Sequence, residues 1–244
     1  MMKKSSKRRL SNILLLTSVI LVIVGIGVLG YGYANSVKAE HDMQKFEYIY
    51  VDEKQDEDDI TSTAYKAIDN CVAWLKVPDT KISYPIMQKE NSPLYYLNKD
   101  AYGNYSYSGT PFLDERCDIN SSQNLIIYGH NMRDGTMFSR LVKYKDTSYC
   151  KAHDKLYLVV NGEKVEYQLY AVAKVNDDDI WYTFIDNENE NMFNNLISYI
   201  QTKSLYISDT DVKYGDSFIT LSTCEYTREN GRLIIIGTRS ESNV

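Results

Sequence analysis

Near the N-terminus, residues 10–37 form a stretch of 28 residues without a charged side chain, rich in Leu, Ile and Val. About 20 apolar residues cross a bilayer core, so this stretch is long enough to span a membrane with some tilt. Five basic residues and no acidic one lie in the preceding segment 1–9, which predicts a cytoplasmic N-terminus and an exported remainder. A cleavable signal peptide is the alternative, but its apolar region is normally shorter, so an uncleaved anchor is favoured.

Beyond the predicted anchor the chain is acidic. Setting the basic tail 1–9 aside leaves 22 basic against 33 acidic residues, a net charge of −11, which argues against nucleic acid as a partner. Residues 38–59 are polar and acidic and are interpreted as a solvated stalk, and residues 60–244 as one extracytoplasmic domain. The four cysteines contain no C-x-x-C spacing, so neither a metal site nor another cofactor is expected, and most of them are expected to be reduced.

The sequence of the domain predicts mainly short strands. We expect a helix over 60–75, an edge strand over 82–87 because it contains Pro85, and further strands over 109–113, 124–128, 156–160, 165–175, 218–223 and 232–238. Asn161-Gly162 predicts a hairpin turn between two of these strands. A short helix is expected over 137–144, and a longer one carries an apolar face formed by Met192, Phe193, Leu196, Ile197 and Ile200. About eight strands with two or three helices favour a β-barrel or sandwich.

Cys224 ends one apolar β-type run, and Arg232 opens the next. If the two runs pair as adjacent antiparallel strands, these residues lie roughly opposite each other, with Cβ atoms about 5 Å apart. Positive charge beside a thiol favours the reactive thiolate. A buried cysteine near a surface arginine is the competing interpretation, because free cysteine is among the most often buried residue types.

Three histidines could act as the proton-transfer partner of a nucleophilic cysteine. His41 lies in the acidic stalk and His153 in a polar turn, where surface positions are expected. His130 follows an apolar strand and Gly129, so it emerges where a strand meets a loop, a common location for catalytic groups. No G-x-S-x-G, H-E-x-x-H or P-loop motif is present, so serine hydrolase, zinc protease and nucleotide-binding functions lack support.

These motifs together resemble the sortases, the membrane-anchored cysteine transpeptidases of Gram-positive bacteria. The run Thr220-Leu221-Ser222-Thr223-Cys224 is similar to the T-L-x-T-C signature, Arg232 matches the family's essential arginine, and Gly129-His130 matches its histidine. The stretch 91–100 resembles class B. This resemblance implies an eight-stranded β-barrel with an N-terminal helix and a helix-bearing insertion between the sixth and seventh strands, at about residues 176–214.

The resemblance also implies an activity and its partners. The enzyme would cleave a C-terminal sorting motif of an exported protein after its threonine and join the acyl group to an amine of a cell-wall peptide, from the outer face of the membrane, with residues 10–37 in the bilayer. Catalysis would rest on His130, Cys224 and Arg232, and the implied substrate contacts are Ser222, Thr223, Glu225, Leu97, Ile180, Trp181 and Tyr182. For the last two, plain packing is the alternative. A membrane-tethered cysteine endopeptidase and a non-catalytic adhesin are the alternative functions.

Overall fold

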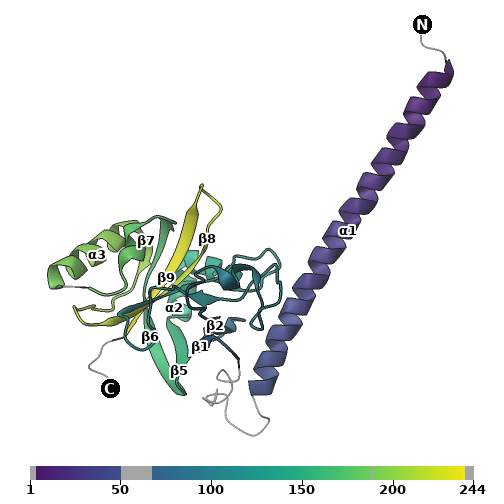
Figure 1. Cartoon of the computed structure of the whole chain (residues 1–244). Helices are drawn as coiled ribbons and strands as arrows, with labels where there is room; N and C mark the ends of the chain where they lie inside the picture. Colours follow the sequence, from purple (N-terminus) through teal and green to yellow (C-terminus); the bar gives the residue numbers. More distant parts are fainter. Residues whose placement is uncertain (1–3, 51–67, 188, 240–244) are drawn as a thin grey trace.

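A computed structural model describes residues 4–50, 68–187 and 189–239. The first described element is one long straight helix, α1 (Lys4–Tyr50) (Figure 1). Its segment Arg9–Ala34 is long and apolar enough to cross a membrane, and none of it is buried against the rest of the described chain. Residues 38–50 of the expected stalk continue this helix, whereas residues 51–59 lie outside the described residues.

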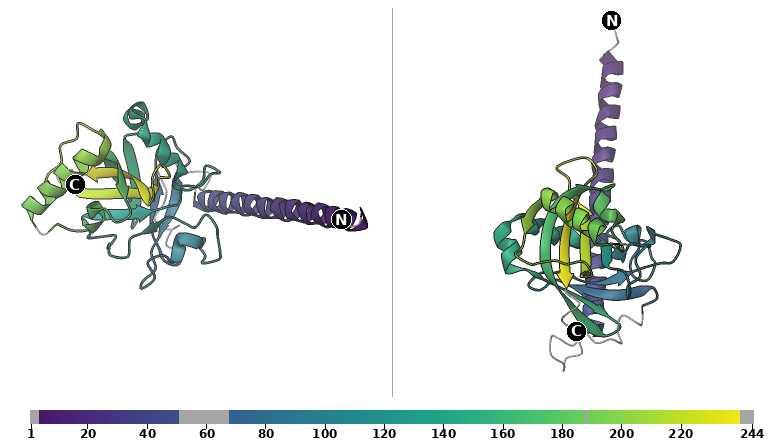
Figure 2. Two further views of the ribbon diagram at one scale, coloured as in Figure 1. Left: turned by 90° about the horizontal axis from the view of Figure 1, so that it is seen from above. Right: turned by 90° about the vertical axis from the view of Figure 1, so that its left-hand side faces the viewer.

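The nine strands of the described chain belong to one sheet, in which eight strands close into a barrel. The strands are β1 (Cys71–Lys76), β2 (Ser83–Met87), β3 (Phe112–Leu113), β4 (Asn124–Tyr128), β5 (Lys155–Val160), β6 (Glu163–Asn176), β7 (Ser204–Ile207), β8 (Ser217–Cys224) and β9 (Gly231–Arg239). They follow the order β5-β1-β2-β3-β4-β8-β9-β6-β7, and β6 also pairs with β5. That pairing closes the ring without β7, which confirms the expected eight-stranded barrel (Figure 2).

The expected helix-bearing insertion separates β6 from the next barrel strand, β8. It contains the short 3₁₀ helix η4 (Ile180–Thr183), the helix α3 (Glu190–Lys203) and β7. The Asn189 side chain caps α3 by accepting a hydrogen bond from the backbone N–H of Met192 at 2.9 Å. Four residues of the expected apolar face, at positions 193, 196, 197 and 200, are buried. Figure 1 shows α3 and β7 together beside β6.

The hairpin between β5 and β6 is confirmed. The two strands pair antiparallel from Lys155↔Gln168 to Val160↔Glu163. The connecting residues Asn161 and Gly162 both have positive φ angles, of 52° and 92°. This backbone is the one that a two-residue turn with the natural strand twist requires, and Asn and Gly adopt it at low cost.

Two expectations about the first strands were wrong. Cys71–Lys76 is strand β1 and not the end of a helix over 60–75, of which residues 60–67 lie outside the described residues. A short apolar run does not distinguish a buried strand from a helix by periodicity alone. Strand β2 is not an edge strand, because it lies between β1 and β3. Pro85 is tolerated there because β3 pairs with β2 only at Met87.

The remaining described helices are short. The 3₁₀ helix η2 (Tyr95–Asn98) follows β2, and the 3₁₀ helix η3 (Phe138–Lys145) and the helix α2 (Thr147–Ala152) lie between β4 and β5. The expected short helix over 137–144 is therefore present as η3. Its first turn packs against the barrel through Phe138, which is fully buried.

Candidate active site

Cys224 is the last residue of β8 and lies directly opposite Arg232 in β9, as the sequence predicted. The N–H of Glu225 donates to the carbonyl of Gly231 at 2.8 Å, so these two neighbours form a hydrogen-bonded pair of the antiparallel ladder. Cys224 and Arg232 therefore form the adjacent non-hydrogen-bonded pair, in which opposed Cα atoms are about 4.5 Å apart and side chains come closest. Both residues are half-buried, so thiol and guanidinium share one partly accessible strand end.

His130 reaches the same place from the other side of β8. Strand β4 runs parallel to β8 with Tyr128 beside Ser222, and the N–H of Gly129 donates to the carbonyl of Ser222 at 3.1 Å. Two residues further along each chain are His130 and Cys224. Parallel neighbours are about 4.8 Å apart, so the end of β4 that leads to His130 lies beside the end of β8 that carries Cys224.

Two side-chain hydrogen bonds hold the ends of β4 and β8 together beyond the last ladder pair. The hydroxyl of Thr223 donates to the carbonyl of Gly129 at 2.7 Å, and the Asn131 amide donates to the carbonyl of Cys224 at 2.9 Å. Each bond joins a residue next to His130 with Cys224 or its neighbour. The loop that carries the histidine is thereby fastened to the strand that carries the thiol.

The orientation of the His130 ring follows from one hydrogen bond. Its Nε2 lies 2.9 Å from the carbonyl oxygen of Leu97, in η2. A carbonyl oxygen can only accept, so the proton at this position belongs to Nε2. In the neutral imidazole Nδ1 is then the basic nitrogen, which is the one able to exchange a proton with a thiol or an amine.

The Arg232 guanidinium makes two long contacts through its terminal nitrogens and keeps further N–H donors for a ligand. Its Nη1 donates to the carbonyl of Gly231 at 3.2 Å, and its Nη2 lies 3.5 Å from a carboxylate oxygen of Asp177. Asp177 follows β6, and in the register of β6 with β9 Val175 is the neighbour of Arg232. A guanidinium has five N–H donors in a fixed plane, so two long contacts leave it able to bind a carbonyl or oxyanion.

The short helix η4 of the insertion packs over the face of β8 that carries the Cys224 thiol. Thr220, Ser222 and Cys224 alternate onto one face of the strand. The Tyr182 hydroxyl is 2.7 Å from the Ser222 hydroxyl, and Trp181 Nε1 donates to the Thr220 hydroxyl at 3.1 Å. Trp181 and Tyr182 of η4 thus contact the two residues of this face that precede Cys224, Thr220 and Ser222.

Comparison with known proteins decides the family. The family model described as the sortase domain matches residues 75–240, more than half of the chain. The chain belongs to the sortase family. It is 34% identical over 170 residues to Sortase B of Listeria monocytogenes, with 68% of each chain covered. It is 28% identical over 237 residues to Sortase B of Staphylococcus aureus, covering 94% of this chain and 96% of that protein.

Solved structures agree with this assignment. Sortase B from Bacillus anthracis in complex with AAEK1 is 31% identical with a TM-score of 0.72, covering 84% of this chain and 98% of that one. The Staphylococcus aureus sortase B–substrate complex is 26% identical with a TM-score of 0.71, covering 84% and 96%. The protein is therefore a class B sortase, a cysteine transpeptidase that acts on surface proteins.

The residues that the sequence suggested as substrate contacts of this sortase fall into two groups. Leu97, Tyr182 and Ser222 adjoin the residues around Cys224 and His130, although Tyr182 and Ser222 are only 7% and 2% exposed and their hydroxyls bind each other. The Ile180 side chain is 52% exposed on the same short helix η4 as Tyr182. Three others are engaged inside the protein: Trp181 is fully buried, Thr223 binds the carbonyl of Gly129, and Glu225 is 2% exposed with its carboxylate in an ion-pair network.

Sequence reasoning gave no role to three charged residues that surround this site. Lys145 and Lys174 bind the Glu225 carboxylate, and Asp177 faces Arg232. Lys145 lies 80 residues before its partner, and charged residues at such separations carry no signal of pairing. For Asp177 the only sequence feature is the polar break after β6, which marks a loop and not a contact.

The other three cysteines of the sortase are free; Cys117 and Cys150 are buried, whereas Cys71, like Cys224, is half-buried. Burial raises the pKa of the Cys71 and Cys117 thiols to about 12 and that of Cys150 to about 11. These thiols stay protonated at neutral pH, where a thiol is a poor nucleophile. Among the described residues, no group of three or more His, Cys, Asp or Glu side chains could hold a metal ion.

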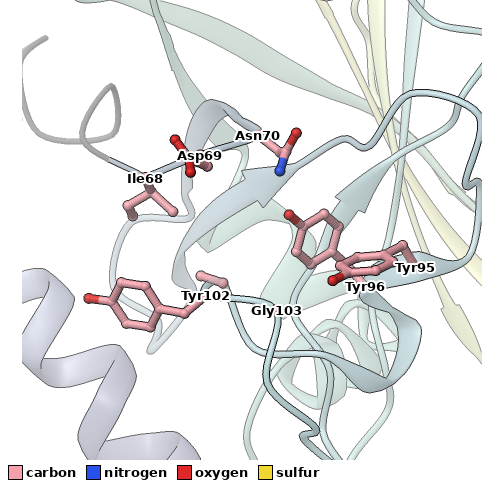
Figure 3. Close-up of a pocket in the computed structure, with 8 residues that line it drawn as sticks. Ile68, Asp69, Asn70, Tyr95, Tyr96, Tyr102 and Gly103 are labelled. Carbon is pink, nitrogen blue, oxygen red and sulfur yellow. The ribbon is translucent and has the colours of Figure 1, made fainter.

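A cavity of about 250 Å³ lies beside η2, whose residues Tyr95 and Tyr96 contribute to its lining. Its lining is formed by Ile68, Asp69, Asn70, Tyr95, Tyr96, Ala101, Tyr102 and Gly103 (Figure 3). None of the three residues at the strand ends contributes to it.

Proposed function

We propose that Cys224, His130 and Arg232 are the catalytic residues of this transpeptidase. The observation that carries the proposal is the meeting of three strand ends, in which Cys224 has Arg232 opposite it on β9 and the end of β4, with His130, beside it. A nucleophile, a proton carrier and a donor for an oxyanion are what acyl transfer through a thioester requires.

In the first half-reaction, the Cys224 thiolate attacks the backbone carbonyl carbon of the threonine in a C-terminal sorting motif. Arg232 donates hydrogen bonds to the oxygen, which becomes negative in the tetrahedral intermediate. His130, as imidazolium, gives its proton to the amide nitrogen, the C–N bond breaks, and the C-terminal tail leaves as an amine. A thioester between Cys224 and the threonine carbonyl remains.

In the second half-reaction, an amine of a cell-wall peptide attacks the thioester. The neutral imidazole of His130 takes the proton from this amine, the C–S bond breaks, and the thiolate is released for another cycle. The products are a new amide between the surface protein and the wall peptide and the enzyme in its starting protonation state.

For substrate binding we propose a groove lined by Leu97, Ile180, Tyr182 and Ser222. The exposed Ile180 side chain offers an apolar contact, and the buried Tyr182–Ser222 hydroxyl pair forms the base of the groove on the face of β8 that carries the thiol. The side chains of Trp181, Thr223 and Glu225, which the sequence also suggested, bind within the protein and are left out of this groove.

We further propose that residues 10–37 hold the enzyme in the cell membrane as a single span, with the catalytic domain on the cell-wall side. The basic segment before the helix supports this orientation, because positive charge is retained on the cytoplasmic side. The amine acceptor then lies in the same compartment as the thiol.

The test supplies the full-length protein with a library of peptides bearing sorting motifs and with triglycine or diaminopimelate as the amine. We expect mass spectrometry to identify cleavage after threonine, a ligated product in excess of free acid, and a trapped thioester that is absent from Cys224→Ala. Free acid as the main product in the presence of amine would instead identify a hydrolase. The absence of any adduct in the wild type would identify a non-catalytic surface protein.

A further inference from the structure

The carboxylate next to the nucleophile is fully engaged inside the protein. Glu225 follows Cys224, and alternation turns its side chain to the opposite face of the chain, where it is 1% exposed. Its Oε1 accepts from Lys145 Nζ at 2.5 Å and lies 3.5 Å from Lys174 Nζ. Its Oε2 accepts from the backbone N–H of Thr227 at 3.1 Å and from the hydroxyl of the same residue.

The two lysines come from the elements that hold the other catalytic groups. Lys174 lies on β6 next to Val175, the neighbour of Arg232 in the sheet. Lys145 is the last residue of η3, and the first residue of η3, Phe138, donates its N–H to the carbonyl of His130 at 2.9 Å. Helix η3 therefore connects His130 at one end with the residue after Cys224 at the other.

A buried ion pair is a rigid connection when every polar atom in it is satisfied. The carboxylate is buried, whereas the Lys145 and Lys174 side chains are 30% and 29% exposed, so removing a lysine leaves the buried carboxylate with fewer partners, which is unfavourable. The bonds from Lys145 and Thr227 outweigh the effect of burial and lower the pKa of Glu225 to about 2, so the carboxylate is charged at any physiological pH.

We propose that Glu225 and Lys145 are positioning residues that fix the separation of the Cys224 thiol and the His130 imidazole through η3. The proposal rests on the proposed function of these two groups. It gives the Glu225 carboxylate a role in aligning the catalytic groups and none in contacting the sorting motif. A misplacement of about 1 Å can cost about a hundredfold in rate, so this connection has a large effect on turnover.

The experiment measures Lys145→Met, Glu225→Gln and the double variant, each in the full-length protein. The readouts are kcat and KM for a sorting peptide, the rate at which iodoacetamide alkylates Cys224 at pH 7, and the folded fraction by circular dichroism. We expect each single change to lower kcat by about tenfold or more with KM unchanged within about twofold. The double variant should be little worse than either single one, because both changes remove the same connection.

The matched control is Glu166→Gln. Glu166 binds Lys155 at 2.8 Å on the hairpin of β5 and β6, and both side chains are nearly half exposed. Losing this surface pair should leave kcat and the alkylation rate at wild-type values. If Lys145→Met does not fold, Thr227→Val and Lys145→Arg replace it in the test, because both variants keep a positive charge beside the Glu225 carboxylate. They should lower kcat by a smaller factor, again without a change in KM.

A raised KM with normal kcat would overturn the proposal and identify Glu225 as a substrate contact. A loss of kcat that equals the loss of folded protein would overturn it in favour of a purely structural role. If the wild type ligates no peptide, the proposed function fails on its own. The alkylation rate then decides the positioning role, and rates in the variants equal to the wild-type rate would overturn it.

Discussion

Cys224 at the end of β8 and Arg232 at the start of β9 occupy directly opposed positions of an antiparallel pair. The thiol and the guanidinium therefore project from the same face of the sheet at the distance at which cross-strand side chains interact most strongly. A charge at this position is not sufficient for the proposed chemistry, because the geometry of the donors decides whether an oxyanion is bound at two points.

We expect Arg232→Lys to lower kcat by about a hundred- to a thousandfold although it retains the charge. A single ammonium cannot reproduce the planar fork, and the loss of one donor to an oxyanion has an effect of about this size. The measurement is steady-state ligation of a sorting peptide to triglycine. Asp177→Asn is the control, since this carboxylate is 3.5 Å from the guanidinium and 41% exposed, and it should retain most of the activity. Near wild-type turnover in Arg232→Lys would remove the arginine from the mechanism.

Selective alkylation should distinguish Cys224 from the other three cysteines. The thiols of Cys71, Cys117 and Cys150 have pKa values raised to about 12, 12 and 11 by burial, so almost none of each is thiolate below pH 9. We expect iodoacetamide to modify Cys224 alone in the native protein at pH 7, and all four cysteines after unfolding in urea. Peptide mapping by mass spectrometry measures this. Modification of a second cysteine at a comparable rate in the native protein would contradict the burial of these thiols.

Strong local patterns made much of the barrel predictable. Strand β4 contains the apolar run Leu125-Ile126-Ile127, the turn of the β5–β6 hairpin is Asn161-Gly162, and α3 has an apolar face with a capping Asn189. Each of these elements is specified by its own residues. The pairing of Cys224 with Arg232 was also predictable, because only a short connector separates the two strands.

Features that depend on distant residues were not predictable. Strand β1 is six residues long and apolar enough to resemble the end of a helix, and its partners β2 and β5 decide its conformation. Strand β7 alternates with no fully buried residue, so its pattern is weak. The burial of the Glu225 carboxylate depends on Lys145 and Lys174, because charged residues in a sequence do not indicate which of them are paired inside the protein.

Acid should destabilise the protein partly through Glu225. Its pKa is lowered from 4.5 to about 2, so its ionisation contributes stability that is present above the unfolded-state pKa and is lost as the pH falls from about 4.5 to about 2. We expect Glu225→Gln to have a lower free energy of unfolding than the wild type at pH 6. Its free energy of unfolding should depend less on pH in this window, so the curves of the two proteins should converge as the pH falls. Urea titrations at pH 6, 4 and 3 measure the difference. Parallel curves for the two proteins would contradict a charged, paired carboxylate.

The position of the His130 ring should depend on a glycine that it does not touch. The Nε2 of His130 binds the carbonyl of Leu97, and a Cβ atom on Gly109 would lie 2.3 Å from this same oxygen. Because a backbone carbonyl cannot move aside as a flexible side chain does, Gly109→Ala must displace η2 and with it the partner of the histidine. We expect a loss of about 1–3 kcal/mol in stability from the overpacking and a fall in kcat of about tenfold or more from the displaced imidazole.

Gly215→Ala separates the strain of the backbone from this displacement. Gly109 and Gly215 both have positive φ angles, of 60° and 99°, so alanine is strained at either position. A Cβ atom on Gly215 would meet no atom within 4 Å, whereas one on Gly109 collides with Leu97. Thermal unfolding should therefore show a loss of stability in both variants that is larger in Gly109→Ala, and ligation kinetics should show a loss of kcat in Gly109→Ala alone. Equal kinetic effects in the two variants would mean that the contact between Leu97 and His130 does not set the reactivity of the imidazole.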